Sequence, residues 1–422
     1  MIMQDNEKKP ALRFKGFTDP WEQRKLAELT KTITTGKSVN SDEGEVSDGD
    51  IGVLKTSCVS YDRFNPSESK PVVKSEQQLV KCAVEKDSVI VSRMNTPERV
   101  GACGYVSTDF PNLFLPDRLW KLKFQDTVDT YFVYMMLVSS AYKEKITSMA
   151  SGTSGSMYNI PKETFLNLQL VIPAKIDEQK QLGKILKKID TLITLHQRKY
   201  EKLVNIKKSM LDKMFPKNGA SVPEIRFKGF TDPWEQRKLE EYLEVSGQKN
   251  FEGIYTKEDV LSVSGDFGIV NQIEFQGRSF AGASVANYGV VETGDIVYTK
   301  SPLKSNPYGI IKANKGKNGI VSTLYAVYKP KQSANPEFVQ IYFEQDARMN
   351  NYMHPLVNKG AKNDMKVSAE NALKGQIVFP DIKEQRTISE FFRNLDTLIT
   401  LHQRKLEKLQ NIKKSCLEKM FV

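Results

Sequence analysis

The chain has 422 residues, of which 39% are hydrophobic and 27% are charged. This composition excludes a wholly disordered chain, and the lack of any run of eighteen apolar residues excludes a transmembrane helix. The net charge is +11, which favours a nucleic acid or another acidic partner. A polar N-terminus and four cysteines without paired spacing predict a cytoplasmic protein with reduced thiols.

Two blocks of sequence occur twice. The first block is Arg13–Leu26, which is identical to Arg226–Leu239. The second block is Asp190–Phe215, which recurs as Asp396–Phe421 with four substitutions. The segments between the blocks show no such similarity. The chain is therefore a tandem duplication, unlike a solenoid of short repeats, in which a shared framework carries two different middle segments.

The first element expected along the chain is a helix start inside the first block. Asp19 suits the N-cap, Pro20 the first helical position and Glu22 the third. The adjacent Trp21 and its copy Trp234 are predicted to bind a partner, because tryptophan is enriched at interface hot spots. A buried anchor within its own domain is the alternative for each tryptophan.

Each middle segment is expected to fold as α+β, with β-rich runs followed by a helix and a polar loop. In the first segment these are strands at 87–93 and 119–124, a helix at 130–145 and a loop at 151–159. In the second they are strands at 294–300 and 319–329, a helix at 336–349 and a loop at 358–366. The two segments are thus expected to share a fold and to differ in surface.

Each half closes on a long helix of about 36 residues, roughly 54 Å at 1.5 Å per residue. Apolar residues recur every three or four positions, which is typical of coiled-coil packing. The expected stripe is Leu182, Ile185, Ile189, Leu192, His196, Lys199, Leu203, Ile206 and Met210, with Ile388, Phe391, Leu395, Leu398, His402, Lys405, Leu409, Ile412 and Cys416 in the second copy. The expected exposed basic face is Lys187, Lys188, Arg198, Lys202, Lys207 and Lys208. Packing of the two copies against each other is favoured over a lone surface helix.

The sequence contains no complete catalytic or metal-binding motif. Thr34–Ser38 ends like a phosphate-binding loop, but Lys31 stands where its first glycine would be. Ser305–Tyr308 lacks the second proline of the amino-methyltransferase loop that stacks on a flipped base. His196 and His402 occupy equivalent helix positions, where packing is favoured over metal binding because no third ligand is near in sequence. We therefore expect no catalytic residue and no metal site in this chain.

The order of these features resembles the DNA-specificity (S) subunits of type I restriction–modification systems, and the resemblance covers nearly the whole chain twice. It is carried by short motifs at each domain start and at the entry to each long helix. These are Phe17–Leu26 and Phe230–Leu239, Pro173 with Glu178-Gln179, Pro380 with Glu384-Gln385, and the Asp-Thr-Leu-Ile runs at Asp190 and Asp396.

The resemblance implies an α+β protein whose two target-recognition domains are separated by two long antiparallel helices. The implied boundaries are 10–176 and 226–382 for the domains, 177–215 and 383–422 for the helices, and 216–225 for a linker. It also implies double-stranded DNA, two methyltransferase (M) subunits and two restriction (R) subunits as partners. S-adenosylmethionine, ATP and Mg are expected on those subunits, with no cofactor and no catalytic role in this chain.

DNA-binding candidates are chosen from loops rich in side chains that anchor phosphates or pair with base edges. In the first domain they are Arg63, Arg93, Asn95, Arg99, Thr153, Ser154, Tyr158 and Asn159. In the second domain they are Arg278, Lys300, Lys304, Asn306, Tyr308, Lys359, Lys362, Asn363 and Lys366. A solvated surface side chain is the alternative for each. A fused methyltransferase or nuclease, and a coiled-coil scaffold without DNA, are the other functions considered.

Overall fold

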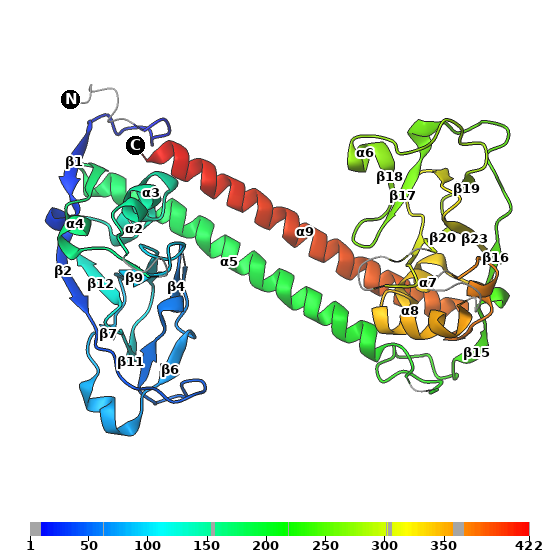
Figure 1. Ribbon diagram of the computed structural model, residues 1–422, viewed down its shortest axis with the longest axis horizontal. Coiled ribbons are helices and arrows are strands. Elements are labelled where there is room, and N and C mark those ends of the chain that lie inside the picture. Colours follow the sequence, from blue (N-terminus) through cyan, green and yellow to red (C-terminus); the bar gives the residue numbers. More distant parts are fainter. Residues whose placement is uncertain are drawn as a thin grey trace. The chain divides into compact units, whose positions relative to one another are not determined.

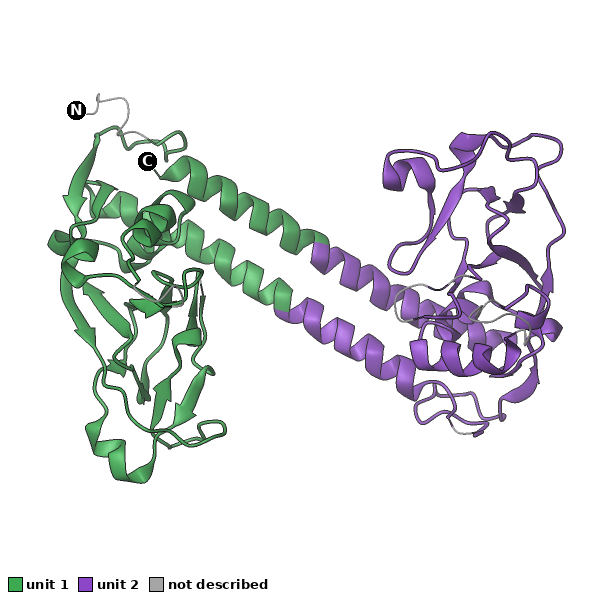
Figure 2. Ribbon diagram, in the orientation of Figure 1, with its two compact units in different colours: residues 1–197, 404–422 green, residues 198–403 purple. Residues whose placement is uncertain are grey.

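The structure is a computed structural model that describes residues 10–61, 63–152, 157–217, 219–300, 302, 306–357 and 367–421. The chain divides into two compact units, one of which is formed by two separate segments of the sequence (Figure 2). Unit 1 comprises Met1–Gln197 and Arg404–Val422, and unit 2 comprises Arg198–Gln403. Each unit therefore contains one middle segment together with parts of both long helices. No helix in the described ranges is long and apolar enough to cross a membrane.

Unit 1 is built on an antiparallel sheet of order β10–β8–β12–β2, of which Figure 1 labels β12 and β2. Its strands are Cys103–Val106, Ser88–Ser92, Leu119–Phe124 and Thr30–Thr35. Because side chains alternate along a strand, Val89 and Val91 of β8 face the helices, and Ile90 faces a second sheet. The second sheet has the order β6–β3–β11–β7, formed by Ser69–Pro71, Gly52–Leu54, Phe110–Phe114 and Ala83–Val84.

Helices and short ladders complete unit 1. The helices are α1 (Leu26–Leu29), α2 (Thr130–Leu137), α3 (Ser140–Ser148) and α4 (Lys162–Leu166). The ladders are β1 (Trp21–Lys25) with β14 (Gln169–Pro173), β4 (Val59–Ser60) with β5 (Arg63–Phe64), and β13 (Tyr158–Asn159) with β9 (Met94–Asn95). The strands predicted at 87–93 and 119–124 are confirmed as β8 and β12.

Unit 2 repeats this plan with a sheet of order β16–β23–β20–β21. The strands are Leu243–Val245, Ala326–Pro330, Ile296–Tyr298 and Ile311–Ala313. Ile296 and Tyr298 face the helices α7 (Pro336–Tyr342) and α8 (Asp346–Met353), and Val297 faces the outer lobe. The outer lobe contains β17 (Leu261–Ser264), β18 (Gly268–Asn271), α6 (Gln272–Gln276), β19 (Gly289–Val291) and β22 (Gly319–Val321).

Three expected elements are divided differently in the structure. The run predicted as one strand at 319–329 forms two strands, β22 and β23, in different sheets. Each helix predicted after the strands is two helices, α2 with α3 and α7 with α8. The break allows all of Tyr131–Leu137 and then Tyr142 and Ile146 to be buried, which one straight helix would not achieve.

The helix start predicted at Asp19 is wrong. Trp21–Lys25 forms β1, which pairs antiparallel with β14, and helix α1 begins only at Leu26. Asp19 instead forms an ion pair with Lys175, Oδ2 to Nζ 2.7 Å. The second copy behaves alike, since β15 (Glu235–Lys238) pairs with β24 (Gln376–Phe379). A distant strand partner therefore overrides the local capping signal.

The two long helices are α5 (Ile176–Lys213) and α9 (Ile382–Met420), with 38 and 39 residues. Within each unit the beginning of one lies antiparallel beside the end of the other (Figure 2). The Lys413 ammonium group is 2.8 Å from a carboxylate oxygen of Asp190 in unit 1. In unit 2 the equivalent ion pair joins Lys207 and Asp396 at 2.7 Å. The predicted packing of the two copies is confirmed within each unit.

The predicted apolar stripe needs correction at several positions. Ile185, Leu398 and Ile412 are 36%, 42% and 41% exposed, and Lys199 and Lys405 are exposed as well. Leu186 replaces Ile185 in the core. Lys207 was expected on the exposed face, but its side chain is only 17% exposed, between the carboxylates of Glu344 and Asp396. These acidic partners come from other segments, so helical spacing did not reveal them.

Candidate nucleic-acid interface

Each middle segment is joined to its long helix by a buried arginine–glutamate pair. In unit 1 the Arg13 Nε and Nη2 atoms donate to the two carboxylate oxygens of Glu178 at 2.6 and 2.8 Å. In unit 2 Arg226 donates to both oxygens of Glu384 at 2.7 Å. The hydrogen bond to Glu178 raises the pKa of Arg13 above its ordinary value, against the effect of burial. Such two-pronged pairs fix geometry strongly.

The glutamine that follows each glutamate makes hydrogen bonds that also connect the long helix to the domain. The Gln179 side chain accepts from the Asp129 backbone N–H (3.0 Å) and donates to the Pro173 carbonyl (2.9 Å). Gln385 makes the equivalent contacts with Asn335 (2.9 Å) and Pro380 (2.9 Å). Asp129 and Asn335 are the N-caps of α2 and α7. The Pro…Glu-Gln motif thus joins strand, long helix and domain helix in both units.

The two tryptophans are core anchors, which is the alternative that the sequence left open. Trp21 is 1% exposed and Trp234 is 3% exposed. Their rings lie 6.1 and 5.9 Å from Phe132 of α2 and Phe338 of α7 respectively. Neither indole is exposed for a partner, so the prediction that these residues bind one is corrected. Packing within the duplicated framework explains why both were repeated.

The end of each long helix completes the core around the other half's tryptophan. In unit 1 the Phe421 ring lies 5.5 Å from Phe132. In unit 2 the Phe215 ring lies 5.8 Å from Phe338. Backbone contacts are duplicated too, because Leu12 N–H donates to Lys419 O at 2.8 Å and Ile225 N–H donates to Lys213 O at 2.9 Å. Both units therefore use the same docking arrangement.

Four candidates of the first domain come together around one short ladder. Tyr158 pairs with Asn95 and Asn159 with Met94 between β13 and β9, and Ile160 N–H donates to Arg93 O at 2.9 Å. Ser151 and Asn159 exchange two backbone hydrogen bonds of 3.0 and 2.9 Å, which closes the polar loop at its base. Thr153 and Ser154 lie in that loop, outside the described residues.

Two members of this group have local structural partners. The Asn95 side chain is 8% exposed, donates to Ser92 Oγ at 3.0 Å and accepts from the Thr96 N–H at 2.9 Å. Arg93 Nε donates to the Asp117 carbonyl at 2.7 Å. These hydrogen bonds hold the Asn95 amide and the Arg93 Nε against the loops around the ladder. Tyr158 and Asn159 are half-buried at its edge.

Arg63 and Arg99 are exposed on neighbouring turns of unit 1. Arg63 belongs to the β4–β5 hairpin, where Ser60 is its partner. Tyr61 of the same hairpin donates from its hydroxyl to the carbonyl of Val100, the residue after Arg99, at 2.9 Å. Exposed guanidinium groups on fixed turns are suited to phosphate or guanine contacts.

The described candidates of the second domain lie after helix α6 and in the segment that follows strand β20. Arg278 is exposed after α6, with its guanidinium carbon 4.6 Å from the Phe280 ring centre. Lys300 has a positive φ of 53° and donates to the Thr323 carbonyl at 3.0 Å. Asn306 donates to Asp346 at 2.9 Å, and Tyr308 lies edge-on to His354 at 6.2 Å. Lys304, Lys359, Lys362, Asn363 and Lys366 lie outside the described residues.

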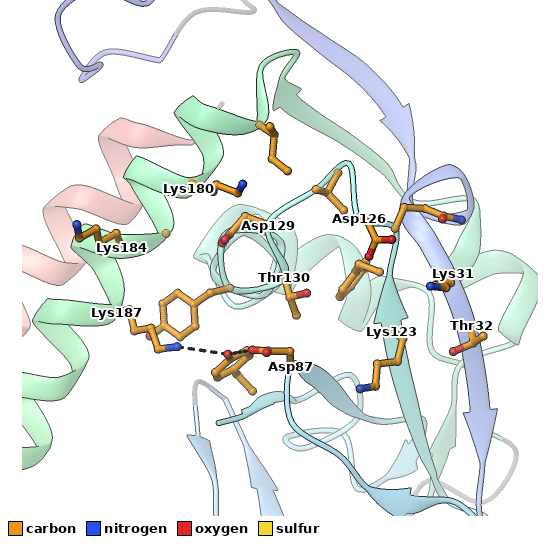
Figure 3. Close-up of a pocket in the computed structure, with 17 residues that line it drawn as sticks. Lys31, Thr32, Asp87, Lys123, Asp126, Asp129, Thr130, Lys180, Lys184 and Lys187 are labelled. Atoms are coloured by element: carbon orange, nitrogen blue, oxygen red, sulfur yellow. Dashed lines mark hydrogen bonds between the residues drawn. The ribbon is translucent and has the colours of Figure 1, made fainter. Parts of the chain in front are cut away.

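Sequence reasoning missed a basic cavity of about 750 Å³ in unit 1 (Figure 3). Strands β2 and β12, the N-terminal side of α2 and the first turns of α5 line it. Its charged lining residues are Lys31, Lys123, Lys180, Lys184, Lys187, Asp87, Asp126 and Asp129. One signal was visible in the sequence, because Lys180, Lys184 and Lys187 have the i, i+4, i+7 spacing of a single helix face.

Within the described ranges, no group of three or more His, Cys, Asp or Glu side chains is arranged to hold a metal. All four cysteines are free thiols. Burial raises the pKa of Cys58 above its ordinary value and that of Cys103 to about 12, so neither thiol ionises near neutral pH.

Residues 18–205 match the family described as Type I restriction modification DNA specificity domain. A putative type I restriction enzyme specificity subunit from Methanocaldococcus jannaschii is 21% identical over 94% of this chain and 91% of its own length. A second M. jannaschii specificity subunit is 22% identical over 68% of both chains. The crystal structure of a type I S subunit from M. genitalium has 16% identity and a TM-score of 0.60, covering 98% of this chain and 99% of that one.

Two α+β units, each joined by the same contacts to parts of two long helices, give this chain the fold of the M. genitalium S subunit. Residues 18–205 match the type I restriction–modification DNA-specificity family, and the resemblance of the whole chain to type I specificity subunits is confirmed. The relatives favour DNA recognition over a fused methyltransferase or nuclease.

Proposed function

We propose that this chain is the sequence-specific DNA-binding subunit of a type I restriction–modification complex. It reads a bipartite, asymmetric target and directs the methyltransferase and restriction subunits to it. The proposal rests on a contact that occurs in both units and that we call the joint. In it, the ion pairs Arg13–Glu178 and Arg226–Glu384 connect two different domains to equivalent helices. A framework that is held constant while its domains differ suits a protein that must read two different half-sites.

Each domain contributes a different set of polar and basic side chains for reading DNA. Lysine and arginine contact phosphates irrespective of sequence, and side chains in the grooves discriminate bases. Unit 1 offers Arg63, Arg99 and the loop closed by Ser151 and Asn159. Unit 2 offers Arg278 and the segment around Lys300 and Tyr308. Because these sets are dissimilar, the two half-sites should have different sequences.

The duplicated framework also supports the number of partner subunits. Two equivalent joints provide two equivalent positions, which suits two methyltransferase subunits and two restriction subunits. We assign S-adenosylmethionine, ATP and Mg to those partners, and no catalytic step to this chain. The cytoplasm, where such subunits would meet cellular DNA, is the location that fits this role.

Methylome sequencing of cells with and without this chain, each expressing the methyltransferase partner, tests the proposal. We expect adenine methylation at one interrupted, asymmetric sequence only when both proteins are present. The purified chain alone should transfer no methyl group from labelled S-adenosylmethionine to DNA. Robust methylation by the chain alone would instead establish the fused-enzyme alternative. A target consisting of one continuous sequence would contradict the assignment of a separate half-site to each domain.

A further inference from the structure

The basic cavity of unit 1 draws its lysines from three separate elements. Lys31 lies on β2, Lys123 on β12, and Lys180 and Lys187 lie on α5. In Figure 3 the ammonium group of Lys180 points toward the cavity, whereas that of Lys184 points away from it. Residues this far apart in sequence meet only because the strands and the helix pack together. The cavity is therefore a product of the tertiary fold.

Two of these lysines are already held by the protein. Lys187 donates to the Tyr105 hydroxyl oxygen at 3.3 Å and lies 5.0 Å from the centre of that ring. Lys123 forms an ion pair with Glu85 at 3.1 Å. Lys31 and Lys180 have no hydrogen bond or ion pair within the described part of the chain. These two ammonium groups are accordingly available to a ligand from outside.

The carboxylates of the cavity are largely engaged elsewhere. Asp129 accepts from the Phe132 N–H at 2.8 Å as the cap of α2, and Asp87 accepts from the Tyr105 hydroxyl. Asp126 is exposed. Without Lys184, whose ammonium group points away, four lysines against three aspartates give the lining a formal charge of +1. A group with one negative charge would balance it, and lysine binds phosphate as a point charge.

The second unit repeats this charge pattern only in part, although it has the same arginine–glutamate pair. Lys31 corresponds to Glu244, and Lys184 corresponds to Glu390. Lys187 corresponds to Arg393, which donates from Nε to Glu337 at 2.9 Å. Gly183 corresponds to Ser389, whose hydroxyl donates to Asn335 Oδ1 at 2.9 Å. Lys180 corresponds to Arg386, so unit 2 keeps a basic residue at this position and lacks the charges of Lys31 and Lys184.

We propose that the unit 1 cavity binds a phosphate group between Lys31 and Lys180. The volume of about 750 Å³ exceeds that of one phosphate and leaves room for its neighbouring groups. Two sources share this chemistry: a phosphodiester of the DNA backbone beside the first half-site, and a free phosphate compound such as pyrophosphate. The DNA source rests on the proposed function, and the free source does not.

The test compares the full chain with two double variants that lose the same charge. One variant is Lys31→Ala with Lys180→Ala, inside the cavity. The control is Lys162→Ala with Lys188→Ala, because both side chains are exposed in unit 1 and neither lines the cavity. Each is assembled with the methyltransferase partner, and binding to a duplex that carries the methylated target is measured at several salt concentrations. Pyrophosphate binding to the full chain is measured separately by calorimetry.

For a DNA phosphate, the cavity variant should make the negative slope of log affinity against log salt shallower by about 0.9 per lost contact. The control should keep the wild-type slope, and both should keep the same target bases. For a free phosphate source, pyrophosphate should bind the wild-type chain and the control but not the cavity variant, with all DNA slopes equal. If neither the slope nor pyrophosphate binding distinguishes the cavity variant from the control, the proposal is overturned.

The failure of the proposed function would look different. A wild-type complex without preference for any methylated sequence would refute the assignment as a specificity subunit. The pyrophosphate measurement would still decide whether the cavity binds phosphate. Chemical acetylation followed by mass spectrometry gives a further readout, since a bound phosphate should protect Lys31 and Lys180 and leave Lys188 reactive. Equal reactivity of all three with and without ligand would contradict the site.

Discussion

Lys207 of the first long helix and Asp396 of the second form an ion pair of 2.7 Å in unit 2, and their sequence equivalents Lys413 and Asp190 form one of 2.8 Å in unit 1. The duplication is thus visible in individual contacts as well as in sequence. Lys207 also pairs with Glu344 of its unit at 2.6 Å. One lysine therefore connects two carboxylates, one on the partner helix and one on the domain.

Replacing Lys207 by Met should lower the free energy of unfolding by about 1–3 kcal/mol, because two carboxylates lose their shared cation. The matched control is Lys208→Met, which removes the same charge from the exposed neighbouring position. Urea unfolding of both variants measures the difference. Equal stability of the two variants would show that the Lys207 network contributes nothing beyond its charge.

Acid should weaken the contact between Glu85 and the buried Lys121, whose atoms lie 2.5 Å apart. The hydrogen bond from Lys121 lowers the pKa of Glu85 below its ordinary value. A carboxylate with a lowered pKa stabilises the fold above its unfolded pKa of about 4.3, and this contribution is lost as the pH falls through the folded value. Between pH 6 and pH 3 the melting temperature should therefore fall less steeply for Glu85→Gln than for the wild type. Parallel curves would contradict the prediction.

Removing the arginine of one joint should destabilise only the unit that contains it. In Arg13→Met the carboxylate of Glu178, whose side chain is 2% exposed, would lose its cation. Breaking a buried pair in this way costs about 3–5 kcal/mol. Hydrogen exchange should accelerate in β1, β14 and α2, while β15, β24 and α7 keep their protection. Arg226→Met is the reciprocal variant and should show the opposite pattern. Loss of protection in both units by either variant would argue against independent joints.

A chain ending at residue 219 should form a dimer that reads a palindrome. Unit 1 needs Lys413 and Phe421 from the second helix, and the first helix carries Lys207 and Phe215 at the same places. A second copy of the half-chain can therefore supply them through an isologous contact. Methylome sequencing with the methyltransferase partner should show an interrupted palindrome of the first half-site. Methylation of the original asymmetric target, or a stable monomer, would refute this model.

Lengthening both long helices should change the spacing of the half-sites and leave their bases unaltered. Seven residues inserted after Gln197 and after Gln403 add about 10 Å of helix, roughly three base pairs. The insertion points lie where the two compact units meet in sequence, so the contacts inside each unit are preserved. The methylated target should keep its bases and gain a longer spacer. An unchanged spacer would show that the helices do not set this distance.

The features predicted well are those encoded by local pattern or by repetition. The 3.5-residue period of 177–215 revealed the long helix α5, and the duplicated blocks revealed the shared framework. Features that depend on distant partners were missed. The strand Trp21–Lys25 pairs with Gln169–Pro173 despite the capping signal at Asp19, and Lys207 is covered by Glu344 from the turn between α7 and α8. The cavity could not be predicted because Lys31 and Lys180 line it together only after folding.

The docking of Phe421 into unit 1 has a consequence for synthesis on the ribosome. Every residue of unit 2, Arg198–Gln403, is made before the last part of unit 1. The domain that is translated second can therefore complete its core first. The core of the first domain, around Trp21 and Phe132, stays incomplete until the final turns of α9 have been synthesised. A chain that ends before Phe421 cannot complete this core by itself, so its first domain depends on a second copy for the missing contacts, as in the half-chain dimer.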